Sequence, residues 1–132
     1  MPEKTESKPL ADRIYQVVRT FVMVRTERKC GIAWDQFKDR KITDPTSGRI
    51  SIDVPAPYRD ARESVATNAF LRVRSCKSKE DFMEFFTATI CSVPQFLPVE
   101  QFREVTSALL DDNRWEETKA LTMLALSGLS RV

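Results

Sequence analysis

A single amphipathic stretch near the middle of the chain, residues 82–94, constrains the fold more than any other feature. Its apolar side chains recur at the three- and four-residue spacing of one helix face, which predicts a helix with one buried side. Ser78 and Asp81 form an acidic variant of a capping box at its start, and Pro94 ends it. Other helices must cover this face. It consists of Phe82, Phe85, Phe86, Thr89, Ile90 and Val93, with Glu84, Thr87 and Cys91 opposite.

Four further segments have the periodicity of helices that could supply this cover. The first begins at Pro9, and its apolar face turns basic beyond Val24, where we expect the helix to leave the core. The second runs from about Tyr58 to Arg74. With the central stretch counted as the third, the fourth begins at Pro98 and the fifth spans 114–129. Because the fifth is hydrophobic nearly all round, it is either enclosed in the bundle or partly covered by another chain. The core faces of the first, second and fourth segments are, in this order, Leu10, Ile14, Val17, Val18, Phe21 and Val24; Ala66, Ala69, Phe70 and Val73; and Val99, Phe102, Val105, Thr106, Leu109 and Leu110.

Residues 39–57 form the one long connection in the chain. Asp44-Pro45, Ser47-Gly48, Pro55 and Pro57 are turn or breaker signals. Within the segment, residues 49–54 alternate like a half-buried strand, which predicts one arm of a short hairpin or an extended strap. Just before the segment, Gly31 interrupts a further helical pattern through Ile32, Trp34 and Phe37.

These patterns predict an all-α domain, a four- to five-helix bundle with one long basic loop at about 39–57. A chain of 132 residues with only three glycines suits a single helical domain over 1–132, and the polar residues 1–8 are expected to form a disordered tail. The uncharged run 120–130 is half the length that a membrane span needs, and no leader opens the chain. We therefore expect a cytoplasmic protein without membrane contact.

Catalysis is disfavoured, and we expect no enzyme activity, no cofactor and no metal. The chain has no histidine, the most frequent general base and metal ligand, and no glycine-rich phosphate loop. Its three cysteines, Cys30, Cys76 and Cys91, form no C-x-x-C pair. An inert buried thiol is the better interpretation of Cys91, because a reactive thiolate needs a nearby base. Acidic pairs such as 111–112 and 116–117 are typical of solvated helix ends.

The remaining signal is an uneven distribution of charge. Residues 1–80 carry 17 basic and 11 acidic side chains, a net of +6, whereas residues 81–132 have a net of −4. An ordinary solvated surface, with cations that complement helix dipoles, would explain part of the excess. The alternative is a track for a phosphate backbone, with Trp34 and Tyr58 as nearby stacking surfaces. The candidate nucleic-acid-binding residues are Arg25, Arg28, Lys29, Lys38, Arg40, Lys41, Arg72, Arg74, Lys77 and Lys79.

Four runs beyond residue 57 point to a known family. Residues 58–63, 68–75, 81–95 and 115–127 resemble the C-terminal region of the large subunit of a type I-B CRISPR surveillance complex, Cascade. The resemblance covers roughly residues 58–130. Arg72 and Arg74 lie inside it, whereas Lys38, Arg40, Lys41 and Arg49 fall outside and are candidates by charge alone.

The resemblance implies a non-catalytic small subunit, made from an internal start codon of the large-subunit gene and present in more than one copy. Its partners would be the Cascade backbone and large subunits, further copies of itself, and the R-loop of crRNA and target DNA. The subunit would bind the displaced non-target strand without sequence specificity and so stabilise the R-loop.

Two alternatives stay open at this point. The chain could be a purely structural helical assembly module, in which the face of residues 120–130 and the Phe96-Leu97 connector contact other subunits without touching nucleic acid. A small cysteine-dependent enzyme would instead need Cys91, and its alkylation would abolish activity.

Overall fold

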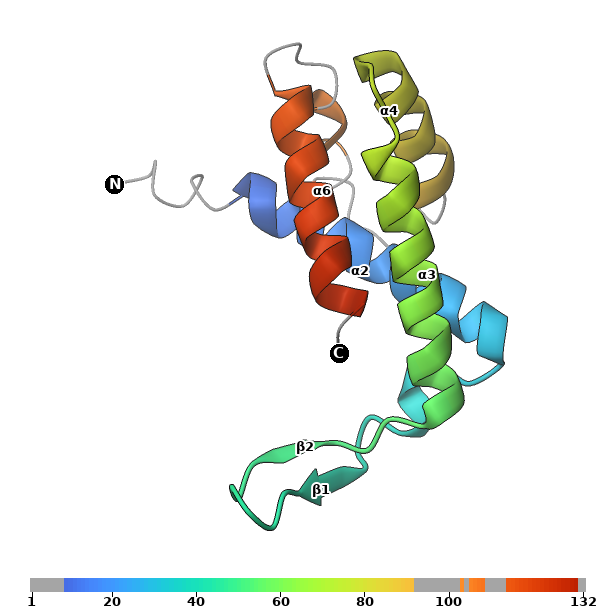
Figure 1. The fold of residues 1–132 in the computed structure, drawn as a ribbon, viewed down its shortest axis with the longest axis vertical. Helices are drawn as coiled ribbons and strands as arrows, with labels where there is room; N and C mark the ends of the chain where they lie inside the picture. The colour runs from blue at the N-terminus through green and yellow to red at the C-terminus, as the bar shows by residue number, and fades with distance from the viewer. Residues whose placement is uncertain (1–8, 92–102, 104, 109–113, 131–132) are drawn as a thin grey trace.

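The computed structural model describes residues 9–91, 103, 105–108 and 114–130, and Figure 1 shows their arrangement. The predicted all-α architecture is confirmed, with one two-stranded sheet as the exception in the described part of the chain. The elements are α2 (Pro9–Cys30), η1 (Trp34–Gln36), β1 (Lys41–Thr43), β2 (Ile50–Ile52), α3 (Ala56–Arg74), α4 (Lys79–Phe85), the π-helical segment η2 (Phe86–Ile90) and α6 (Trp115–Ser130).

Helices α2, α3 and α6 pack against one another and form the centre of the bundle. Figure 1 shows α3 and α6 side by side, with α2 crossing behind both. The predicted faces meet in this core: Ile14, Val17 and Val18 of α2 are fully buried, as are Ala66 and Val73 of α3. Burial of these regularly spaced apolar side chains fixes α2 and α3 relative to each other, and the polar residues on their other faces are positioned as a result.

The central amphipathic stretch forms α4 and then the π-helical turn η2. Ser78 caps α4, because its Oγ accepts a hydrogen bond from the Asp81 amide at 3.1 Å. Phe82, Phe86 and Ile90 are all fully buried, as their spacing predicts. Phe82 also lies against Trp115 of α6, with ring centroids 6.4 Å apart.

The position predicted for Cys91, opposite the phenylalanines, is wrong. The Cys91 amide donates to the Phe86 carbonyl at 2.8 Å, five residues back, which is the hydrogen bond of a π-helix rather than an α-helix. This wider turn changes the helical phase, so Cys91 comes onto the buried side and is only 4% exposed. Glu84 and Thr87, which precede or open the wide turn, are exposed as expected.

The long connection contains the predicted hairpin. β1 and β2 pair antiparallel, with Lys41 opposite Ile52 and Thr43 opposite Ile50. Its turn is closed by Gly48, whose φ of +74° is the left-handed conformation that favours glycine. The predicted half-burial holds at Ile52 and Val54, which are partly buried, but not at Ile50, which is 63% exposed.

The further helical segment expected near Trp34 is a single 3-10 turn, Trp34–Gln36. Glu27 of α2 holds it, because its Oε2 accepts a hydrogen bond from the Trp34 amide at 2.9 Å. Phe37 and Tyr58 lie edge to face with ring centroids 4.8 Å apart, and both are at most 2% exposed. This aromatic cluster anchors the base of the hairpin segment to the start of α3.

Helix α6 matches the helix predicted for 114–129 to within a residue at each end. It is not enclosed, because Leu124 is 70% exposed. Of the fourth predicted helix, Arg103 and residues 105–108 are helical, with Val105 and Ala108 buried. Its other residues, from Pro98 onward, and the tail 1–8 lie outside the described residues. In the part of the chain that the structure describes, no helix combines the length and apolar character of a membrane span.

Candidate nucleic-acid interface

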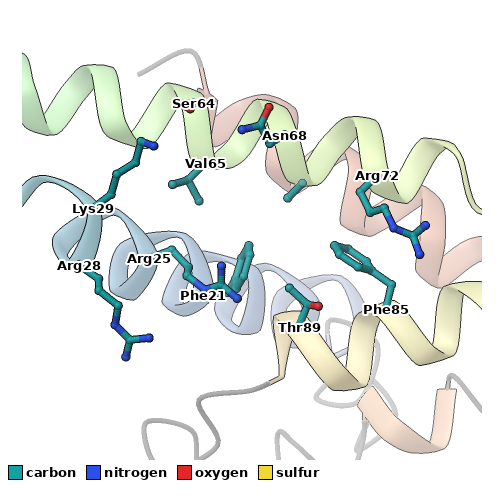
Figure 2. A pocket seen from close by; sticks show the side chains of 11 residues that line it. Phe21, Arg25, Arg28, Lys29, Ser64, Val65, Asn68, Arg72, Phe85 and Thr89 are labelled. Carbon is teal, nitrogen blue, oxygen red and sulfur yellow. The ribbon is translucent and has the colours of Figure 1, made fainter.

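A pocket of about 450 Å³ lies between α2, α3 and the α4–η2 segment (Figure 2). The three elements approach one another because their apolar faces share one core. The described residues that line the pocket are Phe21, Arg25, Arg28, Lys29, Ser64, Val65, Asn68, Ala69, Arg72, Phe85 and Thr89.

Four of these lining residues are cationic, and none of those described is acidic. Arg25, Arg28 and Lys29 come from the last two turns of α2, where spacings of three and four residues place them on neighbouring parts of the helix surface. Arg72 comes from α3, on the other side of the pocket. All four are exposed. Figure 2 shows Lys29 extending toward α3, while Arg28 points away from it at the outer edge.

Two of the guanidinium groups stack on aromatic rings. Arg25 lies over Phe21, with Cζ 5.3 Å from the ring centroid, and Arg72 lies over Phe85 at 5.1 Å. Each contact is worth roughly 0.5–1 kcal/mol at an exposed site. A ring contact occupies the face of a guanidinium rather than its N–H donors, so these rings can orient the arginines without competing with a phosphate for the donors.

Arg72 is also part of a small polar network at the end of α3. Its Nη2 lies 3.4 Å from Oδ1 of Asp81, and its Nη1 donates to the Cys76 sulfur at 3.3 Å. The hydrogen bond to Asp81 raises the pKa of Arg72 above its ordinary value, and the negative charge of Asp81 acts in the same direction. Asp81 therefore offsets part of the positive charge on this side of the pocket, whereas no ion pair is seen for Arg25, Arg28 or Lys29 within the described residues.

The remaining candidate cations lie outside this pocket. Lys38 pairs with Asp35 at 3.2 Å, and Arg40 and Lys41 belong to the hairpin segment. Arg74 stacks on Phe70 with a Cζ-to-centroid distance of 5.9 Å and does not line the pocket with Arg72. Lys77 is exposed and Lys79 is half-buried just after α3. Nucleic-acid contact by these six residues stays a prediction, and the structure groups only Arg25, Arg28, Lys29 and Arg72 around one hollow.

Tyr58, expected to be a stacking surface, is not available as one. Its side chain is 2% exposed and packs against Phe37, so its ring faces are already occupied. The rings that support the pocket are instead Phe21 and Phe85. Phe21 precedes Arg25 by four residues, which is a signal that the sequence contained. The contact of Phe85 with Arg72 depends on the packing of α4 against α3 and had no local signal.

The polar uncharged residues of the pocket were also missed by sequence reasoning. Ser64 and Asn68 project from α3, and Thr89 projects from the π-helical turn (Figure 2). Their hydroxyl and amide groups can hydrogen-bond to phosphate or sugar oxygens. With Val65 and Ala69 between them, the pocket offers charge, hydrogen bonding and apolar contact, which together suit a nucleotide chain.

The thiols show no sign of activation. Burial raises the pKa of Cys91 to about 12, and burial also raises the pKa of Cys76. A raised pKa keeps a thiol protonated and therefore unreactive near neutral pH. Among the residues that the structure describes, no three His, Cys, Asp or Glu side chains gather as a possible metal-ligand set.

The basic pocket lies within a part of the chain that matches a known protein family. The family model of the type I-B CRISPR Cas8b C-terminal domain matches residues 1–129. The chain belongs to this family. The resemblance inferred from residues 58–130 is thus confirmed and extends through the first helix, and membership places the chain in type I-B CRISPR Cascade. Comparison with curated proteins gave no match. Comparison with solved structures gave none either.

Proposed function

We propose that this Cas8b C-terminal chain acts as a non-catalytic small subunit of Cascade and that its basic pocket binds the displaced non-target DNA strand. One observation carries the proposal: four cations from two helices surround a 450 Å³ pocket with no acidic side chain among its described lining residues. Cations that line a hollow attract a polyanion, because each phosphate contact releases condensed counterions and so favours binding.

The chemistry of the pocket favours binding without sequence specificity. Phosphate contacts position a nucleic acid but carry no base information. The arginines and the lysine of the pocket can bind a phosphate equally well whichever base is attached to it. In an RNA-guided complex, base pairing with the crRNA supplies the specificity, and R-loop formation is an almost balanced exchange of two duplexes. A few protein contacts to the displaced strand can therefore shift that balance.

The rival proposal is a purely structural assembly module, and one observation favours it. Leu124 on α6 is 70% exposed, as an apolar side chain at a subunit contact would be in the isolated chain. In this case the pocket cations would only improve solubility and complement the C-terminal end of the α2 dipole, worth roughly 0.3–1 kcal/mol each.

Binding of a labelled oligothymidylate to the full chain, followed by fluorescence anisotropy, separates the two proposals. The nucleic-acid proposal expects binding that weakens as salt rises and that is lost in an Arg28→Glu, Lys29→Glu double variant. An Arg59→Glu, Arg114→Glu double variant changes two exposed cations outside the pocket and shifts the net charge by the same amount, so it is the matched control. Equal loss in both variants would mean that net charge, rather than the pocket, determines binding.

The same variants should be tested in the complete complex. In Cascade bound to its DNA target, Arg28→Glu with Lys29→Glu should shorten the lifetime of the R-loop while leaving the content of subunits unchanged. An R-loop of normal lifetime in a fully assembled variant complex would refute a role for the pocket on the displaced strand and leave the assembly module.

A further inference from the structure

A second, smaller pocket of about 180 Å³ lies at the junction of α2, η1, α3 and the end of α6. It shares no described lining residue with the basic pocket, since α2 presents a different side to each. Most of its lining is apolar or aromatic, and two members are arginines. The lining residues are Tyr15, Arg19, Val22, Met23, Trp34, Tyr58, Arg62 and Leu129.

Arg62 is the unusual group in this pocket. Its Nη2 is buried, and no group of the described residues accepts a hydrogen bond from that atom. Cζ of Arg62 lies 5.8 Å from the centroid of the Tyr58 ring, which is itself held by Phe37. Burial lowers the pKa of Arg62, and the like charge of Arg59 acts in the same direction. A guanidinium nevertheless stays charged at neutral pH, so this one is charged, partly desolvated and incompletely satisfied.

Such a group is costly in a folded protein. A buried donor without a hydrogen-bond partner lowers the free energy of unfolding by roughly 1–3 kcal/mol, and by more when it is charged. Within the described residues, neither Arg62 nor Arg19 has an ion pair. A carboxylate satisfies a guanidinium best, since it can accept two parallel N–H bonds. The pocket is therefore complementary in charge to an acidic side chain that the described part of the chain does not provide.

The walls identify the kind of molecule that would carry the carboxylate. Trp, Tyr, Arg and Met are enriched at protein interfaces, and the residues that dominate binding energy are most often Trp, Tyr and Arg. Here Trp34, Tyr15 and Met23 line the same pocket as Arg62. The volume is below the roughly 300–1,000 Å³ of sites for small molecules, so it suits a single side chain.

A nucleic acid fits these observations less well. Tyr58 offers no free ring face to a base, because it is 2% exposed and packed on Phe37. Two arginines in a mostly apolar hollow also differ from a track of several cations along a backbone. The basic pocket, with its four cations, has that character instead.

We infer that the second pocket is a docking site for an acidic side chain, with an apolar neighbour, on another protein subunit of Cascade. The carboxylate pairs with Arg62, with Arg19 adding charge at the exposed side, and the apolar neighbour packs on Tyr15, Met23 and Leu129. This inference depends on the family membership of the chain. It does not depend on the proposed nucleic-acid function, so the two can fail separately.

Incorporation of the labelled full chain into Cascade assembled from the other subunits tests the inference. Arg62→Met keeps the length of the side chain and removes the charge, and it should weaken incorporation by about 30-fold, as expected for a dominant interface residue. Oligothymidylate binding by the same variant should be unchanged. Arg59→Met, on the same helix and exposed, is the control for incorporation, and circular dichroism checks folding.

A second variant identifies the occupant directly. Arg62→Lys places an amine in the pocket, and a carbodiimide then couples that amine to any carboxylate that touches it. Mass spectrometry of the assembled complex should show a new cross-link to an Asp or Glu of another protein, absent from an Arg59→Lys complex. A cross-link to nucleic acid, no new cross-link in an assembled complex, or normal incorporation of Arg62→Met would each overturn the inference.

Discussion

The chain has two basic regions that look alike in sequence and differ in structure. One is the basic pocket, which is lined by Arg25, Arg28 and Lys29 from the end of α2 and by Arg72 from α3. The other is the hairpin segment, residues 38–51, in which every side chain is exposed. In the pocket, two cations lie over phenylalanine rings. In the hairpin segment, Lys38 pairs with Asp35, and further acids alternate with the cations.

The difference shows that the supporting scaffold, rather than the density of charge, makes a candidate site. Helices α2 and α3 keep the pocket cations at fixed separations because their apolar faces share a core with Phe82 and Phe86. The hairpin is supported mainly by its own strand pairing and by its turn at Gly48. Pocket cations can thus bind an extended phosphate chain with little ordering cost, whereas hairpin cations must first be ordered.

The largest expected difference between the two regions is in stability. Phe86→Ala should lower the free energy of unfolding by about 3–5 kcal/mol, because it removes a fully buried ring from the core that α2 and α3 share. Ile50→Ala in the hairpin should change it by less than about 0.5 kcal/mol, because that side chain is 63% exposed. Urea denaturation of both variants gives the comparison, and similar losses would mean that the hairpin packs on the bundle.

The next effect concerns nucleic-acid affinity. Reversing Arg25, Arg28 and Lys29 to Glu should weaken oligothymidylate binding by roughly 100-fold at moderate salt, since attraction becomes repulsion at about three phosphate contacts. The matched hairpin variant reverses Lys38, Arg40 and Lys41 and changes net charge by the same amount. Its expected loss is about 10-fold or less. A hairpin variant that loses as much as the pocket variant would reverse the comparison.

A smaller effect should appear at alkaline pH. The pKa of Cys91 is about 12 in the folded protein, against an ordinary value of 9.0, so the folded state holds the proton more tightly. The protonated thiol therefore contributes to the free energy of unfolding. This contribution is fully present below pH 9 and decreases as pH rises from 9 to 12, by about 1 kcal/mol at pH 10. Wild type should therefore lose more stability than Cys91→Ala between pH 8 and pH 10. Equal losses would show that the thiol is not buried as described.

The smallest effect is expected for Arg72→Gln. Its ion pair with Asp81 is exposed on both sides, at 46% and 41%, so solvent screens the pair and its loss should change the free energy of unfolding little. Affinity for oligothymidylate should fall several-fold, less than for the α2 cations, because Asp81 already offsets this charge. Fluorescence anisotropy measures the affinity and urea denaturation measures the stability of the same sample. A loss of affinity as large as that of the α2 triple variant would assign the main phosphate contact to α3.

The helices and the hairpin could be predicted because their signals are local. The spacing of Phe82, Phe86 and Ile90, the cap at Ser78 and the turn at Gly48 each act within a few residues. The π-helical turn could not be predicted, because it depends on how η2 packs in the core. For the same reason, sequence indicated many cations but not which of them share a pocket. That grouping follows from the packing of α4 and η2 against α2 and α3.

The salt dependence of binding tests the central claim most directly. For wild type, the logarithm of the affinity for oligothymidylate should fall linearly with the logarithm of salt concentration. Each phosphate contact to a single strand contributes about 0.7 to that slope, so the Arg25, Arg28 and Lys29 variant should show a slope smaller by about 2. The hairpin variant should keep most of the wild-type slope. An unchanged slope in the pocket variant would contradict the account, because the pocket would then make no phosphate contacts.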